Sequence, residues 1–270
     1  MSSTFKNPLV VGCGSWGTAL ALLLTNKCPQ VHLLGRNQNT VDQINSSREN
    51  KHYLPGITLP PNLVTTTDPG IADNADLILF VIPTSATRTA AENLAKQSIS
   101  KTTVLLSCSK GIERETGKRM SEIISDSFSE NPVAVLSGPN HAEEIARGLP
   151  AAATIGCSDI AIGEALQHTF SNERFRCYTN EDVAGIEFGG ALKNIFAIAA
   201  GVAAGLKLGD NAISALVTRA LAEMIRLGTQ LGGNPDTFPG LSGLGDLMTT
   251  CFSPHSRNQR IGVALGKGQK

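Results

Sequence analysis

Short apolar runs alternate, over the first two thirds of the chain, with longer stretches whose apolar positions recur at helical spacing. Apolar runs bounded by polar residues are typical of strands buried on both faces of a parallel sheet. The alternation predicts a doubly wound α/β sheet. The predicted strands are residues 9–12, 31–34, 76–82, 103–107, 133–136, 151–156 and 175–179. The predicted helices between them are residues 15–27, 40–48, 85–96, 118–128 and 159–170.

After Asn180 the pattern changes to long helical stretches. Residues 181–208 are rich in small and apolar residues and predict one long helix, with its glycines as candidate kinks. Three more helices are predicted, with Asn211 as the N-cap of the first; they are residues 211–231, 243–251 and 256–265. We therefore predict an α/β domain over residues 1–181 and an all-helical domain over residues 182–270.

Composition narrows the class of protein. The 23 basic and 23 acidic side chains cancel, so the chain has no general positive field for nucleic acid or an anionic membrane. The longest apolar segment, residues 195–206, is too short to cross a bilayer, and residues 1–8 lack the apolar stretch of a signal peptide. The six cysteines are scattered, which is typical of reduced core thiols. These features predict a soluble cytoplasmic protein without membrane insertion.

A glycine-rich turn, Gly12-x-Gly14-x-x-Gly17, follows the first predicted strand. Glycines at this spacing allow a tight turn, close approach of a pyrophosphate, and close packing of helix on strand. The pyrophosphate would lie at the start of the helix that begins at Ser15. Trp16 would pack either against the cofactor or in the core. Because the turn links a buried strand to a helix, we predict dinucleotide binding by a Rossmann-type sheet.

Arg36 follows the second predicted strand, where sites specific for NAD often carry an acidic residue. A guanidinium group can pair with the 2′-phosphate of NADP. This residue favours NADP and leaves NAD use open. The alternative interpretation is an arginine exposed to solvent.

Lys193 is a single cation within the long apolar helical stretch. An unpaired charge is costly to bury, so such a lysine is usually kept for chemistry or tied to a partner. The alternative is a lysine that extends along the helix surface to solvent. Together with a dinucleotide site, a buried lysine suggests hydride transfer in which the lysine handles the proton.

Two loops and one helix start are further candidates. Lys110 follows the strand 103–107, and residues 137–142 follow the strand 133–136. Ligands of open α/β sheets bind at the carboxyl ends of strands. The segment Ser256-Arg257-Asn258 offers backbone N–H groups and a guanidinium to a phosphate, with ordinary helix capping as the alternative. The histidines lack metal-ligand spacing, and no metal is predicted.

Together these segments resemble the soluble NAD(P)-dependent glycerol-3-phosphate dehydrogenases of the bacterial type. The resemblance implies reversible reduction of dihydroxyacetone phosphate by NAD(P)H to sn-glycerol 3-phosphate, a precursor of glycerophospholipids, in a homodimer. The motifs that carry it occur in the family's order: Gly-x-Gly-Ser-Trp-Gly-Thr-Ala, Ser-Lys110-Gly-Ile-Glu, Ser137-Gly-Pro, Gly-Gly-Ala-Leu-Lys193-Asn-Ile, Gly243-Leu-Gly-Asp246-Leu and Ser256-Arg257-Asn258.

The resemblance also implies residue roles. Lys193 would be the catalytic proton donor and acceptor, assisted by Lys110 and Asp246. Burial and the second cation would both lower the pKa of Lys193. Cofactor contacts would be the glycines of the fingerprint, which are Gly12, Gly14 and Gly17, together with Ser15, Trp16, Arg36, Lys110, Ala142 and Arg257. Substrate contacts would be Lys110, Gly138, Asn140, Lys193, Asp246, Ser256, Arg257 and Asn258.

The chain departs from the family's pattern in places. Asn140 stands where the family often has Ser or Thr, and His141 where it often has an apolar residue. The family normally continues with more helices beyond Lys270, so we expect an incomplete helical domain. One rival is a β-hydroxyacid dehydrogenase, which usually places Asn four residues after the lysine, where this chain has Ala197. The other is a non-catalytic NADP-binding sensor, in which the lysines and Asp246 would share no purpose.

Overall fold

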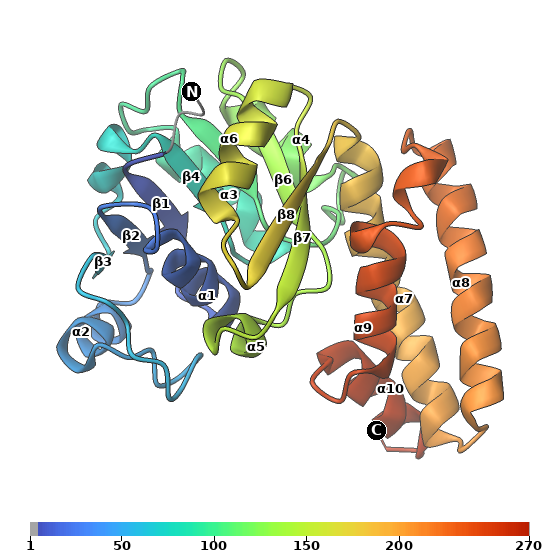
Figure 1. Ribbon diagram of the computed structural model, residues 1–270. Coiled ribbons are helices and arrows are strands. Elements are labelled where there is room, and N and C mark those ends of the chain that lie inside the picture. Colours follow the sequence, from blue (N-terminus) through green and yellow to red (C-terminus); the bar gives the residue numbers. More distant parts are fainter. Residues whose placement is uncertain (1–4, 270) are drawn as a thin grey trace.

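The computed structural model describes residues 5–269, and it consists of a sheet covered by helices, followed by a group of long helices (Figure 1). Residues 1–4, which begin the segment considered for a signal peptide, and residue 270 lie outside the described residues. The sheet has the strand order β3-β2-β1-β4-β5-β6-β7-β8. Neighbouring strands are parallel except β6 and β7, which are antiparallel. The strands are β1 Pro8–Val11, β2 Val31–Leu34, β3 Leu63–Thr66, β4 Leu77–Phe80, β5 Val104–Ser107, β6 Val133–Ser137, β7 Ala151–Gly156 and β8 Phe175–Asn180.

The observed strands include every predicted one and add β3, which the sequence analysis did not predict. β3 is an edge strand that pairs with β2 alone. Pro60 and Pro61 lie directly before it and Pro69 soon after, and prolines so close together are typical of a loop. Its pairing with β2, rather than its own pattern, makes this segment a strand.

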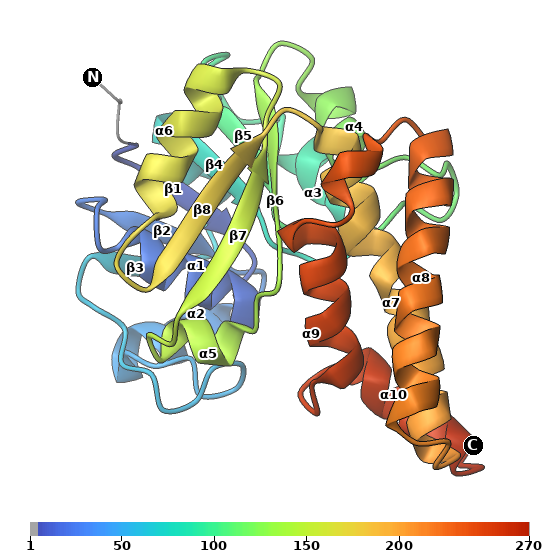
Figure 2. The same ribbon diagram turned by 45° about the vertical axis from the view of Figure 1, so that its right-hand side comes forward.

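Helices cover both faces of the sheet, as Figures 1 and 2 show. Val10 on β1 packs in one cluster with residues of α1 and α6, whereas its neighbours Leu9 and Val11 pack in another with residues of α3 and α4. Alternate strand residues therefore face opposite layers of helices, as the period of a β-strand requires. The helices of this part are α1 Ser15–Leu24, α2 Gln38–Ser47, α3 Thr84–Leu94, α4 Met120–Ser127, α5 Ala142–Ala146 and α6 Ile160–Phe170, with a 3-10 turn η1 at Pro69–Asn74.

The helical part is built around α7 Val183–Gly205, which packs against α8 Asp210–Gln230, α9 Asp246–Phe252 and α10 Arg257–Gly266. A 3-10 turn η2 at Pro235–Thr237 and a π-helical turn η3 at Leu241–Gly245 precede α9. α7 is one continuous α-helix through its glycines, so these positions do not interrupt it.

The predicted N-cap Asn211 is wrong. α8 begins at Asp210, and Gly209 is its N-cap without any side-chain hydrogen bond. Gly209 has a φ of 83°, which a glycine adopts readily. The chain therefore enters the helix at Asp210 without a side-chain cap. Asn211 therefore already lies inside the helix.

α7 is apolar over a greater length than the predicted segment 195–206. Among residues 5–269, α7 is the one helix long and apolar enough to cross a membrane by length and composition. It exceeds the 195–206 segment because the helix continues upstream through Lys193 and Glu187. More than half of its most apolar window (56%) is buried inside the structure, where it packs on α8, α9 and α10, as a core helix does.

Glycines allow α7 and α10 to approach closely. A Cβ atom added to Gly201 would lie 2.2 Å from the backbone oxygen of Gln259. One added to Gly262 would lie 2.1 Å from the backbone oxygen of Ile198. No side chain fits at this crossing, so the glycines fix how near α10 lies to the helix that carries Lys193.

Replacing Gly262 by Val should destabilise the protein by about 1–3 kcal/mol, because the added carbons must push two backbones apart. Urea unfolding of the variant and the parent measures this difference. Ala222→Val is a matched control, since Ala222 is exposed on α8 and the same β-branched residue there alters only helix propensity. Equal loss of stability in the two variants would contradict the proposed close contact.

Candidate active site

Lys110 and Lys193 meet at one carboxylate, that of Asp246. The Nζ atom of Lys193 on α7 donates to Oδ1 of Asp246 and, at 2.8 Å, to Oγ1 of Thr250. The Nζ atom of Lys110, in the loop after β5, donates to Oδ2 of Asp246 at 2.6 Å. Asp246 is 1% exposed and Lys193 is 7% exposed. Tertiary structure thus brings both lysines and the aspartate, from the two parts of the chain, into one buried cluster.

The environment of Lys193 changes its acidity. Burial lowers its pKa from the usual 10.5 to about 8, and the positive charge of Lys110 acts in the same direction. The charge and hydrogen bond of Asp246 oppose this shift. A pKa near 8 allows Lys193 to gain or lose a proton near neutral pH, as a general acid or base must.

Two residues of this cluster were not anticipated from the sequence. Thr250 follows Asp246 by one turn of α9, so both face the same lysine, and this i, i+4 spacing was the available signal. Gly190 lies on α7 one turn before Lys193, and a Cβ there would be 3.4 Å from Cγ of Lys110 and 2.8 Å from Oγ of Ser137. The glycine leaves room for the Lys110 side chain between the helix and the sheet, and the Gly189-Gly190 pair was its signal.

The loop after β6 lies beside Lys110, whose Nζ donates to the backbone oxygen of Gly138 at 2.7 Å. Nδ2 of Asn140 donates to the backbone oxygen of Ala152 at 2.9 Å. Three buried polar atoms at the end of β6 and in this loop have no hydrogen-bond partner within the described part of the chain: Oγ of Ser137, Oδ1 of Asn140 and Nε2 of His141. Buried polar atoms are rarely left unpaired, so a bound ligand is a natural partner for them.

His141 links this loop to the start of α10. Its ring lies edge-to-face with that of His255, with 6.0 Å between centroids. Burial lowers the pKa of His141, although the nearby carboxylates of Glu143 and Glu144 act to raise it. The imidazole is therefore neutral at pH 7 and presents a hydrogen-bonding nitrogen rather than a charge.

The start of α10 reaches the same region. Ser256 is the N-cap and accepts a hydrogen bond from the backbone N of Gln259 at 3.2 Å, so the capping interpretation is realised. Nδ2 of Asn258 donates to Oδ1 of Asn194 at 2.8 Å, which ties this helix start to the residue after Lys193. Arg257 is exposed at the same end of the helix. A role for the segment in binding phosphate stays a prediction.

The fingerprint turn is shaped by packing at two glycines and open at the third. A Cβ at Gly12, whose φ is 118°, would lie 2.3 Å from the backbone oxygen of Val81, and one at Gly17 would lie 1.9 Å from that of Gly12. A Cβ at Gly14 would meet nothing within 4 Å. Gly14 is the N-cap of α1 and no side chain caps this helix start. The turn thus leaves space and N–H groups for a pyrophosphate, as a dinucleotide requires.

Three of the other predicted cofactor contacts lie on α1, on α5 and just after β2. Trp16 is partly buried and packs against the core clusters, in line with the core interpretation of this residue. Ala142 is buried at the start of α5, where it packs with Ala19 of α1. Arg36 is exposed just beyond β2.

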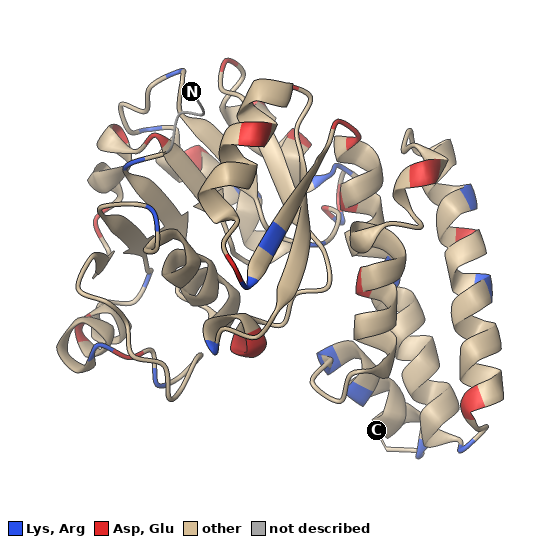
Figure 3. Cartoon of the chain, in the orientation of Figure 1, with Lys and Arg blue, Asp and Glu red and all other residues tan. Residues whose placement is uncertain are grey.

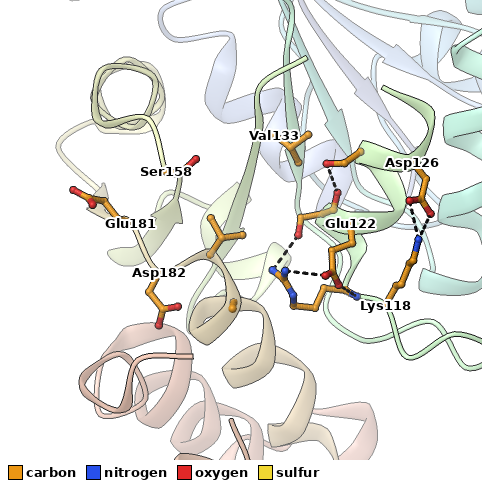
Figure 4. A pocket seen from close by; sticks show the side chains of 12 residues that line it. Lys118, Glu122, Asp126, Val133, Ser158, Glu181 and Asp182 are labelled. Carbon is orange, nitrogen blue, oxygen red and sulfur yellow. Dashed lines mark hydrogen bonds and ion pairs between the residues drawn. The ribbon is translucent and has the colours of Figure 1, made fainter. Parts of the chain in front are cut away.

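No group of three or more metal-ligating side chains is found among residues 5–269. An open pocket of about 650 Å³ lies between α4 and the start of α7, with Glu122 and Asp182 on opposite walls (Figure 4). None of the residues that line it belongs to the lysine cluster. Basic and acidic residues are interspersed along both parts of the chain in Figure 3.

Known proteins of one family match this chain over most of its length. The family models described as the N-terminus and the C-terminus of NAD-dependent glycerol-3-phosphate dehydrogenase match residues 9–162 and 182–270. The chain is 48% identical to glycerol-3-phosphate dehydrogenase [NAD(P)+] of Moorella thermoacetica over 261 residues, covering 96% of this chain and 77% of the relative. It is 48% identical to the protein of that name from Bacillus pumilus over 269 residues, covering 98% and 78%.

A solved structure agrees as well. The crystal structure of glycerol-3-phosphate dehydrogenase from Coxiella burnetii matches with a TM-score of 0.93 and 38% identity. The match covers 97% of this chain and 81% of that chain. With both family models matched across most of its length, the chain belongs to the NAD-dependent glycerol-3-phosphate dehydrogenase family.

Proposed function

We propose that this chain catalyses reversible hydride transfer between NAD(P)H and dihydroxyacetone phosphate to give sn-glycerol 3-phosphate. The observation that carries the proposal is the shared contact of Lys110 and Lys193 with Asp246, beside a loop with unpaired polar atoms. The relatives that carry the name glycerol-3-phosphate dehydrogenase [NAD(P)+] support the same substrate. Supply of a glycerophospholipid precursor is the proposed cellular role.

In the proposed mechanism Lys193 is the general acid. NAD(P)H, when bound, would supply the hydride, and negative charge would then develop on the former carbonyl oxygen. Lys193 gives its proton to that oxygen, and neutral Lys193 takes the hydroxyl proton back in the reverse direction. Lys110 stabilises the charge on oxygen, and its own charge lowers the pKa of Lys193. Asp246 holds both ammonium groups in place.

The fingerprint turn and its surroundings fit the cofactor. Gly12, Gly14 and Gly17 would shape the turn, and the N–H groups of Ser15 and Trp16 would face the pyrophosphate. The open space at Gly14 supports this placement. The remaining contacts proposed from the family are Arg36, Lys110, Ala142 and Arg257.

The chemistry of the unpaired atoms suggests how the substrate is oriented. Oδ1 of Asn140 can only accept a hydrogen bond, because an amide oxygen carries no hydrogen. The hydrogen bond from Nδ2 to the backbone of Ala152 fixes the orientation of this amide. It would therefore receive a substrate hydroxyl and repel a phosphate. Arg257 and the N-terminus of α10, with Ser256 and Asn258, would take the phosphate instead. Gly138 would contact the substrate through the backbone.

Replacing Arg36 by Ala should raise the KM for NADPH about tenfold and leave the KM for NADH within a factor of two. The loss corresponds to about 1.4 kcal/mol, as for one exposed pairing of a guanidinium with phosphate. Steady-state rates with each cofactor at saturating substrate measure the effect. Arg147→Ala, at another exposed arginine, is the control. Equal changes in KM for NADPH and NADH would show that Arg36 does not bind the 2′-phosphate.

The proposed reaction is tested by following NADPH and NADH oxidation with dihydroxyacetone phosphate and the purified chain. We expect turnover with this ketone. In the reverse direction we expect no turnover with 3-hydroxy acids. Turnover of 3-hydroxy acids would favour the β-hydroxyacid dehydrogenase alternative. Cofactor binding without turnover of any phosphorylated ketone would favour the sensor.

We also propose a homodimer in the cytoplasm, with the chain divided at residues 181 and 182 into its two domains. Exposed apolar side chains of α7, α10 and the turn after α7 support a partner surface: Ile195, Leu206, Leu208, Ile261 and Leu265. Light scattering of the purified chain would give the mass of a monomer if the dimer proposal is wrong. Limited proteolysis tests the division of domains.

A further inference from the structure

Glu187 is a buried carboxylate that the proposed mechanism does not use. It lies on α7 and is 8% exposed. Its Oε1 accepts a hydrogen bond from the backbone N of Ser121 at 2.9 Å. Its Oε2 accepts from Nη1 of Arg119 at 2.9 Å and from Oγ of Ser121. A buried carboxylate without its partners would be an uncompensated charge. The one cation and two further donors therefore fix the position of the Glu187 side chain.

The partners of Glu187 belong to the other part of the chain. Arg119 is the residue before α4, and Ser121 lies in its first turn. Arg119 also pairs with Ile112 in an isolated antiparallel bridge, which closes the loop that follows Lys110. Its guanidinium carbon lies 5.9 Å from the centre of the Phe188 ring on α7. The Glu187–Arg119 contact therefore joins the base of the Lys110 loop to α7.

The same stretch of α7 carries Lys193 to its place. Glu187 precedes Lys193 by less than two helical turns, and Gly190 between them packs on the Lys110 side chain. The two ammonium groups share Asp246, so their separation depends on how α7 sits against the Lys110 loop. A shift of α7 would remove Lys193 from both the second cation and the buried site.

We propose that Glu187 is a positioning residue, which through Arg119 and Ser121 holds α7 so that Lys193 stays beside Lys110 and Asp246. This proposal rests on the proposed reaction and adds a residue that places its general acid. Figure 4 shows the junction between α4 and the start of α7, where Glu122 and Asp182 line one pocket. Figure 2 shows α4 at the end of α7 where that helix begins.

The experiment compares Glu187→Ala, Glu187→Gln and Arg119→Gln with the parent, well below the melting temperature of each. The readout is the pH dependence of labelling of Lys193 by a small amine-reactive reagent, quantified by mass spectrometry. In the parent the midpoint should lie at about 8. In Glu187→Ala and Arg119→Gln it should rise by about one pH unit or more, because burial and the neighbouring cation hold it down. Glu187→Gln keeps the acceptor oxygen and should restore part of the shift.

Glu113→Gln is the matched control. Glu113 lies in the same loop and pairs with Arg88 at 2.7 Å, a contact that does not involve α7. This variant should leave the Lys193 midpoint unchanged. An unchanged midpoint in both Glu187→Ala and Arg119→Gln would overturn the proposal, since Glu187 would then only stabilise the fold.

Turnover provides a second, separable readout. Glu187→Ala should lower kcat about tenfold or more, while NADPH binding at the fingerprint turn, which Glu187 does not contact, stays within a factor of two. Absence of turnover in the parent itself would contradict the proposed reaction and leave the labelling test of Glu187 intact. A normal kcat in Glu187→Ala would count against the positioning role.

Discussion

Replacing Lys193 by Ala should lower kcat for reduction of dihydroxyacetone phosphate by about 10²–10⁴-fold, the contribution of a positioned general acid. NADPH affinity should stay within a factor of two, because the fingerprint turn lies between β1 and α1 and includes none of the residues that contact Lys193. In the parent, kcat for reduction should fall as pH rises through about 8, since the acid is the protonated lysine. That fall should be absent from the residual activity of the variant.

Two comparisons make this result specific. Lys96→Ala removes an exposed lysine and should leave kcat and its pH profile unchanged. Lys193→Met keeps most of the buried volume and should lose as much activity as the alanine variant, which separates the lost proton from a lost contact. A kcat within threefold of the parent in either Lys193 variant would refute the role of this lysine as the acid.

Replacing Asp246 by Asn should cost about 3–5 kcal/mol of unfolding free energy at pH 7, because two ammonium groups lose the buried carboxylate that they share. The kcat should also fall at least about 10²-fold, since neither lysine would be held at the reacting oxygen. Urea unfolding and steady-state rates measure the two effects. The prediction would be contradicted if the variant unfolded at the same urea concentration as the parent.

The loss of stability should depend on pH. Asp246 raises the pKa of Lys193, so the variant has a still lower folded-state pKa than about 8. The unfolded chain, with an ordinary lysine near 10.5, then binds more protons than the folded chain between these two values. Stability therefore rises with pH across that window, and more so in the variant. Unfolding at pH 7 and pH 9 should show a smaller gap between variant and parent at pH 9.

Asp126→Asn is the matched control for this prediction. Asp126 is also shared by two cations, with Lys118 at 2.8 Å and Arg88 at 3.1 Å, but its side chain is 35% exposed. Solvent screens such pairs, so the substitution should cost far less stability than Asp246→Asn. A loss as large as that in Asp246→Asn would indicate that burial is not the reason for the difference.

Local patterns were sufficient for much of the fold. Within residues 5–269, the apolar runs located seven of the eight strands, and the fingerprint marked the turn at Gly12, because strand period and turn chemistry are properties of neighbouring residues. β3 escaped because the prolines around it favour a loop, and its strand form depends on pairing with β2. The Asn211 cap failed because Gly209 begins the helix through its own backbone freedom.

Local patterns pointed to a dinucleotide-type sheet, a helical second part and a lysine that was too costly to bury without purpose. The contacts of that lysine depend instead on tertiary packing. Lys110 and Lys193 meet Asp246 across separations of 136 and 53 residues, and Glu187 meets Ser121 across 66. Charge pairs of this kind depend on how distant segments pack and exclude water, and no local period or motif encodes that arrangement.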